Sequence, residues 1–293
     1  MNLLYDEINM NAKKYYSDKN VLYAMAEYTK DNREFCMITP TWINEINQET
    51  QKTNMRMLRC HSTQSFEYYL QRFSFYNDRF HNLYYSLARY DGPVPKRDTA
   101  GWVNVELKQF YKNHRDHMDS FDFFIDIDSS GKMDVNMAYI SARLLKKLFD
   151  SWNVPYQLRF SGKGFHFIID GLLFKGYGFK FNVLSETSIF KAYSKMARWL
   201  NINVSEMVDV NIYDSRRVIK LPYSLAIYKD NVQVCRPFLS NKEFNKWKYY
   251  DYSQHNIIEK VIPRRNKHIF KRYGNVSKLL KKTGVLKDGE SNG

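Results

Sequence analysis

The stretch FDFFIDID, from Phe121 to Asp128, ends on two alternating acids. Successive side chains of a strand point to opposite faces, so Asp126 and Asp128 share one face. The other face is aromatic and aliphatic, as the core side of a half-buried strand must be. Two neighbouring carboxylates repel each other unless water screens them or a cation binds both, and Mg²⁺ prefers carboxylate oxygens. The stretch predicts a strand whose polar end is either a solvated acidic surface or a metal site.

A second motif, LRFSGKGFHFII, runs from Leu158 to Ile169 and predicts two strands joined by a glycine turn. Its two glycines permit a tight turn with exposed backbone N–H groups, which can hold phosphate oxygens. The turn is not a nucleotide P-loop, because the Gly-Lys-Ser/Thr ending and the following helix are missing. The histidine lies on the polar side of the second strand, where an ordinary edge residue is the simpler interpretation. The candidate phosphate-binding residues are Ser161, Gly162, Lys163 and His166.

A third motif, VDVNIYDSRRVIKLPYS from Val208 to Ser224, adds a carboxylate at Asp209 and cations just after it. An acid that completes a metal site, followed by cations that hold a polyphosphate, is typical of metal-dependent nucleotidyl transfer. A charge run alone is more often a solvated face. The candidate cations are Arg217 and Lys220.

Taken in order, the three motifs resemble those of the archaeo-eukaryotic primase superfamily. This family includes primase small subunits, stand-alone primase-polymerases and the polymerase domains of bacterial end-joining ligases. The resemblance covers roughly residues 55–240. It is closest to the stand-alone primase-polymerases of plasmids, phages or CRISPR-linked loci, because the three cysteines match no zinc motif and no zinc cluster is expected. One departure is Gly164, where many members carry a serine; Ser161 is the candidate replacement.

The resemblance implies an α/β (α+β) fold, with a two-lobed catalytic core and an RNA-recognition-like mixed sheet flanked by helices. It also implies a DNA primase/polymerase that synthesises and extends primers on single-stranded DNA. Asp126, Asp128 and Asp209 would hold two Mg²⁺ or Mn²⁺ ions, and Tyr111 would sense the sugar 2′ position. The triphosphate would be bound by Ser161, Gly162, Lys163, His166, Arg217 and Lys220.

Composition agrees with a polyanionic partner. The chain has a net charge of +14 and a pI near 9.4, which suits a single-stranded template, a primer–template duplex and dNTP or NTP substrates. No segment resembles a signal peptide or reaches the roughly 20 apolar residues of a membrane span. With only three cysteines, a cytoplasmic, reducing location without membrane contact is expected.

Three regions are expected along the chain: an N-terminal helical region over 1–50, the catalytic domain over 51–252 and a basic C-terminal segment over 253–293. Periodicity predicts helices over 65–75, 103–114, 135–152 and 187–200, strands over 55–60 and 83–89, and a hairpin over 225–236. The C-terminal segment is either a solvated tail or a template contact. Its candidate template-binding residues are Arg264, Arg265, Lys267, Lys271 and Arg272.

Two other functions remain open. A nucleotide-sugar transferase also uses Asp-x-Asp to hold a metal, although it needs neither the +14 charge nor the cations of the second and third motifs. A non-catalytic, nucleic-acid-binding relative would keep the basic surface and lose the acids, whereas all three acids are present here. A purely structural or adaptor role has the least support.

Overall fold

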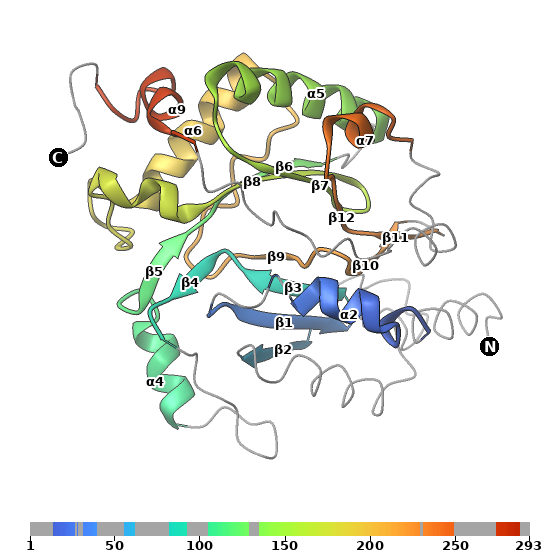
Figure 1. Ribbon diagram of the computed structural model, residues 1–293. Helices are drawn as coiled ribbons and strands as arrows, with labels where there is room; N and C mark the ends of the chain where they lie inside the picture. The colour runs from blue at the N-terminus through green and yellow to red at the C-terminus, as the bar shows by residue number, and fades with distance from the viewer. Residues whose placement is uncertain are drawn as a thin grey trace, which may run out of the picture.

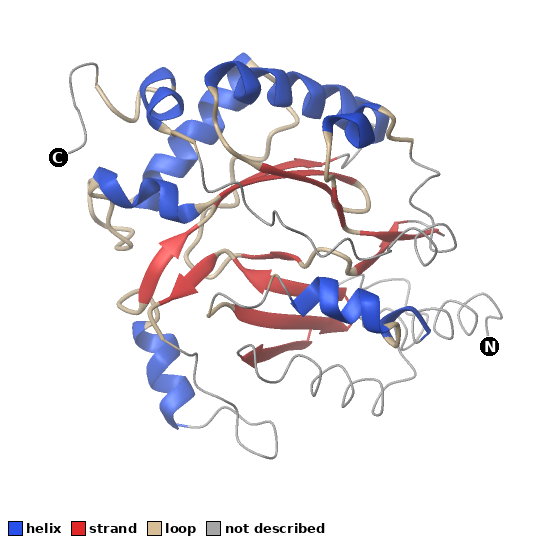
Figure 2. Ribbon diagram, in the orientation of Figure 1, coloured by secondary structure: helices blue, strands red, loops and turns tan. Residues whose placement is uncertain are grey.

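Two four-stranded sheets form the framework of the protein. The computed structural model describes residues 14–26, 28, 32–39, 56–61, 82–92, 105–128, 135–228, 231–248 and 274–287. The β6 sheet has the strand order β12-β7-β8-β6, and the β9 sheet has the order β2-β1-β3-β9. In Figure 1 the β9 sheet lies below the β6 sheet, and helices α5, α6, α7 and α9 lie above it. Figure 2 shows the same layers by type of secondary structure.

The β6 sheet is built from a strand–helix–strand–strand–helix sequence of elements. Its strands are β6 (Phe123–Asp128), β7 (Gln157–Phe160), β8 (Gly164–Ile169) and β12 (Arg236–Pro237). Helix α5 (Val135–Trp152) joins β6 to β7, and α6 (Ile189–Asn203) follows β8 and a 3-10 helix, η1 (Gly171–Tyr177). After α6, Val208 forms a bridge with Ile127. This is the βαββαβ order, with a single bridge in place of the last strand, so the RNA-recognition-like arrangement is confirmed.

The expectation of mixed strand directions needs a correction. Every pairing between the described strands is antiparallel. Strands β6 and β7 are joined by a helix and run in the same direction, but β8 lies between them. Because β8 runs against both neighbours, no parallel pair forms in this sheet.

The core lies between the β6 sheet and its helices. Phe123, Ile125 and Ile127 are fully buried on one face of β6, as the alternation predicts. Helix α5 packs on that face, and its Phe149 ring meets the Phe167 ring of β8 edge to face at 5.8 Å. The predicted bounds of α5 are confirmed, because its apolar residues recur at helical spacing over its whole length.

The β9 sheet is assembled from distant parts of the chain. Its strands are β1 (Glu34–Thr39), β2 (Arg56–His61), β3 (Asn82–Ser86) and β9 (Val218–Lys220). Helix α2 (Lys19–Ala26) lies within residues 1–50, where the sequence predicted only helix. Strand β1 belongs to the same range, yet it pairs with β2 and β3 from beyond residue 50.

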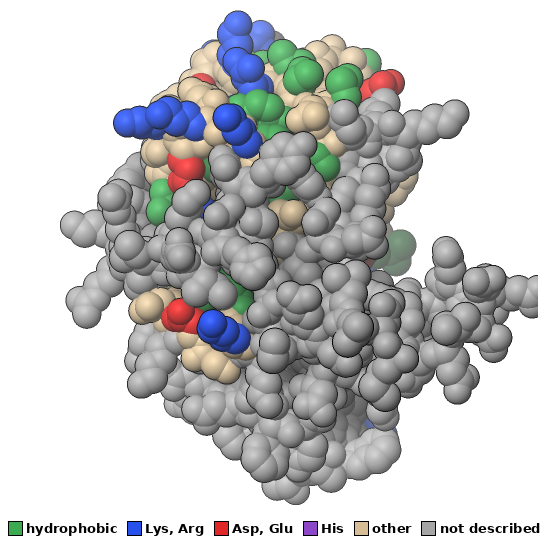
Figure 3. Space-filling model, turned by 90° about the vertical axis from the view of Figure 1, so that its right-hand side faces the viewer, with side chains coloured by type: hydrophobic (Ala, Val, Ile, Leu, Met, Phe, Trp, Pro, Cys, Tyr) green, Lys and Arg blue, Asp and Glu red, His purple; other side chains and the backbone are tan. Residues whose placement is uncertain are grey.

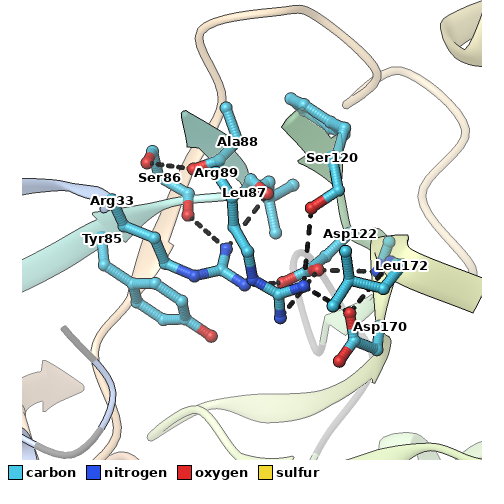
Figure 4. Close-up of polar contacts among 12 residues, drawn as sticks. Arg33, Tyr85, Ser86, Leu87, Ala88, Arg89, Ser120, Asp122, Asp170 and Leu172 are labelled. Atoms are coloured by element: carbon cyan, nitrogen blue, oxygen red, sulfur yellow. Dashed lines mark hydrogen bonds and ion pairs between the residues drawn. The ribbon is translucent and has the colours of Figure 1, made fainter. Parts of the chain in front are cut away.

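A buried ion network joins the layers at the start of β6 (Figure 4). The guanidinium of Arg33 donates to the carboxylate of Asp122 at 2.6 Å and to the carbonyl oxygen of Ser86 at 2.8 Å. Arg89 forms an ion pair with Asp170, whose carboxylate also accepts from the first turn of η1. All four charged side chains are buried, and each charge has an opposite charge beside it. Removing one partner of such a pair is strongly destabilising.

The remaining elements flank these sheets. They are β4 (Ala88–Tyr90), β5 (Met118–Phe121), α4 (Val105–Asn113), β10 (Leu225–Tyr228), β11 (Asn231–Val234), α7 (Asn241–Asn245) and α9 (Ser277–Lys282). The expected strand over 83–89 is two strands, β3 and β4, while the hairpin over 225–236 is confirmed as β10 and β11. The predicted helix over 65–75 lies outside the described residues. None of the described helices is long and apolar enough to cross a membrane.

The described end of the C-terminal segment is anchored to the helical layer. Leu279 and Leu280 of α9 are fully buried, and the backbone of Gly274 lies against the ring of Pro155. The Lys195 ammonium of α6 donates to the carbonyl oxygen of Gly284. Residues 274–287 therefore pack on the helical layer through a few buried side chains, whereas the five basic residues proposed to bind template lie outside the described residues.

Candidate functional site

A row of polar residues crosses the β6 sheet on the face opposite α5. In the strand register Asp126 of β6 lies opposite His166 of β8, which lies opposite Arg159 of β7. Residues paired directly across antiparallel strands point to the same face. The row therefore faces the β9 sheet, because helix α5 covers the other side (Figure 1).

Asp126 and His166 interact directly. The Nε2 atom of His166 lies 3.4 Å from Oδ1 of Asp126, and the histidine is buried while the acid is half-buried. Burial lowers the pKa of His166 below its ordinary value, although the Asp126 carboxylate opposes the shift. A neutral imidazole that donates from Nε2 is consistent with this environment. The sequence predicted His166 on the polar side of its strand, and the structure places it there, opposite Asp126.

Asp128 lies two residues after Asp126 on the same face of β6, and it forms an ion pair with Lys163. The lysine comes from the glycine turn, and half of its side chain is exposed. The second carboxylate oxygen, Oδ1 of Asp128, is buried and has no hydrogen-bond partner among the described residues. An orphaned carboxylate oxygen is costly to bury, so it marks a place where a cation or water would be stabilised.

Asp209 is brought to the same edge by its backbone. Its N–H donates to the carbonyl oxygen of Asp126 at 3.0 Å, beside the bridge between Val208 and Ile127. Its side chain accepts from the backbone N–H of Asn211 at 2.8 Å. The fold therefore gathers the three predicted acids at one edge of the sheet, although Asp209 is more than 80 residues from the other two in sequence.

The carboxylates of Asp126, Asp128 and Asp209 are not arranged around one point, as the ligands of a metal ion would be. Within the described part of the chain, no group of three or more His, Cys, Asp or Glu side chains is placed to hold a metal ion. Lys163 engages Asp128, and the Asn211 N–H engages Asp209. The oxygen-rich donor set and the orphaned Oδ1 of Asp128 nevertheless fit a hard divalent cation.

The glycine turn is tight because two backbones approach closely. A side chain at Gly164 would overlap the carbonyl oxygen of Ile127 in the neighbouring strand, so a serine cannot fit here without backbone movement. Gly162 has a φ of 107°, which favours glycine. The hydroxyl of Ser161 accepts from the N–H of Gly164 at 3.0 Å. Ser161 therefore stabilises the turn in this structure.

The two predicted cations of the third motif lie in different surroundings. Arg217 forms an ion pair with Asp214 at 2.9 Å and donates to the carbonyl oxygen of Ile212, so both contacts are within its own loop. Lys220 ends β9 and is half-buried, with its ammonium 5.9 Å from the centre of the Tyr84 ring. Burial lowers the pKa of Lys220 from 10.5 to about 8. Cys235 and the carboxylates of Asp126 and Asp128 oppose this lowering of the pKa, whereas the ammonium of Lys163 adds to it.

Tyr111 lies on α4 and contacts the loop after Asp209. The guanidinium of Arg216 lies 5.0 Å from the centre of the Tyr111 ring. His114, one turn later, lies 3.0 Å from the hydroxyl oxygen of Ser215 in the same loop. Helix α4 therefore supports this loop.

Comparison with known proteins finds the fold but no close relative. The polymerase domain of ligase D from Mycobacterium tuberculosis, solved in complex with DNA, is similar to this chain with a TM-score of 0.50 at 11% sequence identity. The similarity covers 86% of this chain and 88% of that one. No protein-family model and no curated protein matches. The chain therefore has an α+β fold similar to that of this polymerase domain.

Proposed function

We propose that the chain is a template-directed nucleotidyltransferase that synthesises and extends primers on single-stranded DNA. The observation that carries the proposal is the meeting of Asp126, Asp128 and Asp209 at one sheet edge. Lys163 and Lys220 lie close enough for their charges to interact with those acids. Acids beside cations are what a metal-bound nucleoside triphosphate requires.

The three aspartates would hold two Mg²⁺ or Mn²⁺ ions, which supply charge stabilisation for phosphoryl transfer. Lys163 would leave Asp128 for the triphosphate when the metal arrives, since a cation on the carboxylate displaces the ammonium from its ion pair. His166, in the row itself, and Lys220, from the opposite β9 sheet, would contact the phosphates. The turn N–H groups of Gly162 and Lys163 would complete the cradle, with Ser161 holding the turn in shape.

Two further assignments are part of the proposal. Arg217 would reach the triphosphate only after exchanging its ion pair with Asp214. Tyr111 would sense the sugar 2′ position from α4, where its ring contacts Arg216 of the loop after Asp209. DNA as template and product is favoured by the +14 charge and by the DNA complex of the similar polymerase domain.

The deciding experiment supplies single-stranded template, Mg²⁺ or Mn²⁺ and each set of labelled nucleotides, with and without a primer. Template-dependent product without a primer is expected. Product only with a primer would limit the function to extension. Absence of product together with turnover of a nucleotide sugar would favour the sugar transferase instead.

A separate prediction concerns α9. Ending the chain before Gly274 should lower the melting temperature sharply, because burial of two leucines contributes about 1.5–3 kcal/mol each. Changing Lys281 and Lys282 to Gln should leave both stability and template affinity unchanged, since both side chains are exposed and α9 lies with α5 and α6 on the side of the β6 sheet away from the β9 sheet (Figure 1). Thermal unfolding and binding of a single-stranded oligonucleotide at several salt concentrations check both. A salt slope reduced by about 0.7 for each lysine would instead place α9 on the template.

A further inference from the structure

Arg159 is a fully buried arginine for which no carboxylate partner is recorded among the described residues. Its side chain is completely shielded from water, although burying an unpaired charge costs several kcal/mol. The buried Arg33 and Arg89 both have aspartate partners. Among the described residues the hydrogen-bond acceptors of Arg159 are neutral instead, so its position needs a reason beyond the pairing of charges.

The two terminal nitrogens of Arg159 connect the two sheets. One donates to the hydroxyl of Tyr85 in β3 at 2.6 Å, and the other donates to the carbonyl oxygen of Lys220 in β9 at 3.1 Å. The guanidinium also lies 5.5 Å from the centre of the Tyr85 ring. Arg159 belongs to the β6 sheet, whereas both of its acceptors belong to the β9 sheet. Its hydrogen bonds therefore fix the spacing between the sheets at this point.

This point lies at the site. Arg159 stands in the row with His166 and Asp126, and neighbouring strands are about 4.8 Å apart. Lys220, whose carbonyl Arg159 holds, comes from the opposite sheet and carries the ammonium proposed to meet the phosphates. Nε of Arg159 and Nδ1 of His166 are buried, and neither has a hydrogen-bond partner among the described residues.

We infer that Arg159 is a positioning residue for the nucleotide: by holding the Lys220 backbone and the Tyr85 hydroxyl together, it sets where the Lys220 ammonium stands relative to Asp126 and His166. The inference rests on the proposed function of that site. Arginine suits the task because its planar fork makes two bonds of fixed geometry at once. A lysine has a single ammonium on a flexible chain, so it cannot hold both acceptors in the same way.

The test is a double-mutant cycle on nucleotide use. Arg159→Met keeps a long side chain and removes both bonds, and Lys220→Ala removes the proposed phosphate ligand. Arg159→Met alone should raise KM for the nucleotide about 10-fold while kcat changes little, because a displaced ligand loses binding that substrate and transition state share. In the Lys220→Ala background, Arg159→Met should have no further effect on KM, because the two residues act as one unit.

Arg89→Met is the matched control, since Arg89 is also a buried arginine, but its ion-pair partner is Asp170, just before η1 (Figure 4). It should lower the melting temperature and leave KM unchanged. Arg159→Lys, which retains one donor, should recover part of the affinity, and it serves if Arg159→Met does not fold.

The outcomes separate the two levels of argument. Additive effects of Arg159→Met and Lys220→Ala on KM, or an equal rise of KM in Arg89→Met, would overturn the positioning role. If the wild-type protein neither binds nor turns over nucleotide, the proposed function itself fails, independently of how the Arg159 and Lys220 variants behave.

Discussion

An Asp126→Asn protein is expected to fold like the wild type and to incorporate nucleotide at least about 1,000-fold more slowly. The carboxylate is half-buried at the polar end of β6, and its side chain packs in no core. An amide of the same shape keeps the strand but removes the charge that attracts a divalent cation, and each factor of ten in rate corresponds to about 1.4 kcal/mol. Primer extension at saturating template and metal measures the loss.

Asp119→Asn is the control for this substitution. Asp119 is a partly exposed acid of β5 that forms an ion pair with Lys175, so the same chemical change occurs away from the row. Exposed pairs contribute little to stability, and activity should be retained. Normal extension by a well-folded Asp126→Asn protein would remove this carboxylate from the chemistry. Loss of activity in both variants would point to a general defect.

Local patterns of the sequence predicted the parts of the site that each motif contains. Alternation over Phe121–Asp128 placed Asp126 and Asp128 on one face because strand geometry has a period of two, whatever the rest of the chain does. The glycine turn followed in the same way, since Gly162 needs a positive φ and the flanking residues form strands. Helix α5 was predicted to its exact bounds for a similar reason.

What the sequence did not reveal depends on pairing between distant segments. Strand β1 was missed because nothing local shows that Phe35 pairs with Tyr85, 50 residues later. The sequence indicates only that Arg159 belongs to a strand, because its hydrogen-bond acceptors come from β3 and β9 of the other sheet. The one available signal was a charged residue among apolar neighbours in a strand, which identifies a buried charge without identifying its partners.

The charge of Lys220 should make nucleotide use depend on pH in a range where most lysines do not titrate. Burial places its pKa at about 8 instead of 10.5, so the ammonium is charged below that value and is lost as the pH rises through it. KM for the nucleotide should therefore be constant below about pH 7 and rise above about pH 8. Burial raises the pKa of Cys235 and lowers that of His166, which moves both away from the transition expected for Lys220.

Below about pH 8, Lys220→Ala should raise KM by roughly 10- to 150-fold, because a hydrogen bond to a charged group contributes about 1.5–3 kcal/mol, and its difference from the wild type should shrink as the ammonium is lost at higher pH. Lys220→Arg stays charged at every pH used, so its KM should be flat between pH 7 and 10 even if its absolute value is higher. Steady-state KM measured for the three proteins across this range tests the assignment. The same rise of KM with pH in the wild type and in Lys220→Arg would show that another group titrates, and Lys220 would then have to be placed outside the nucleotide site.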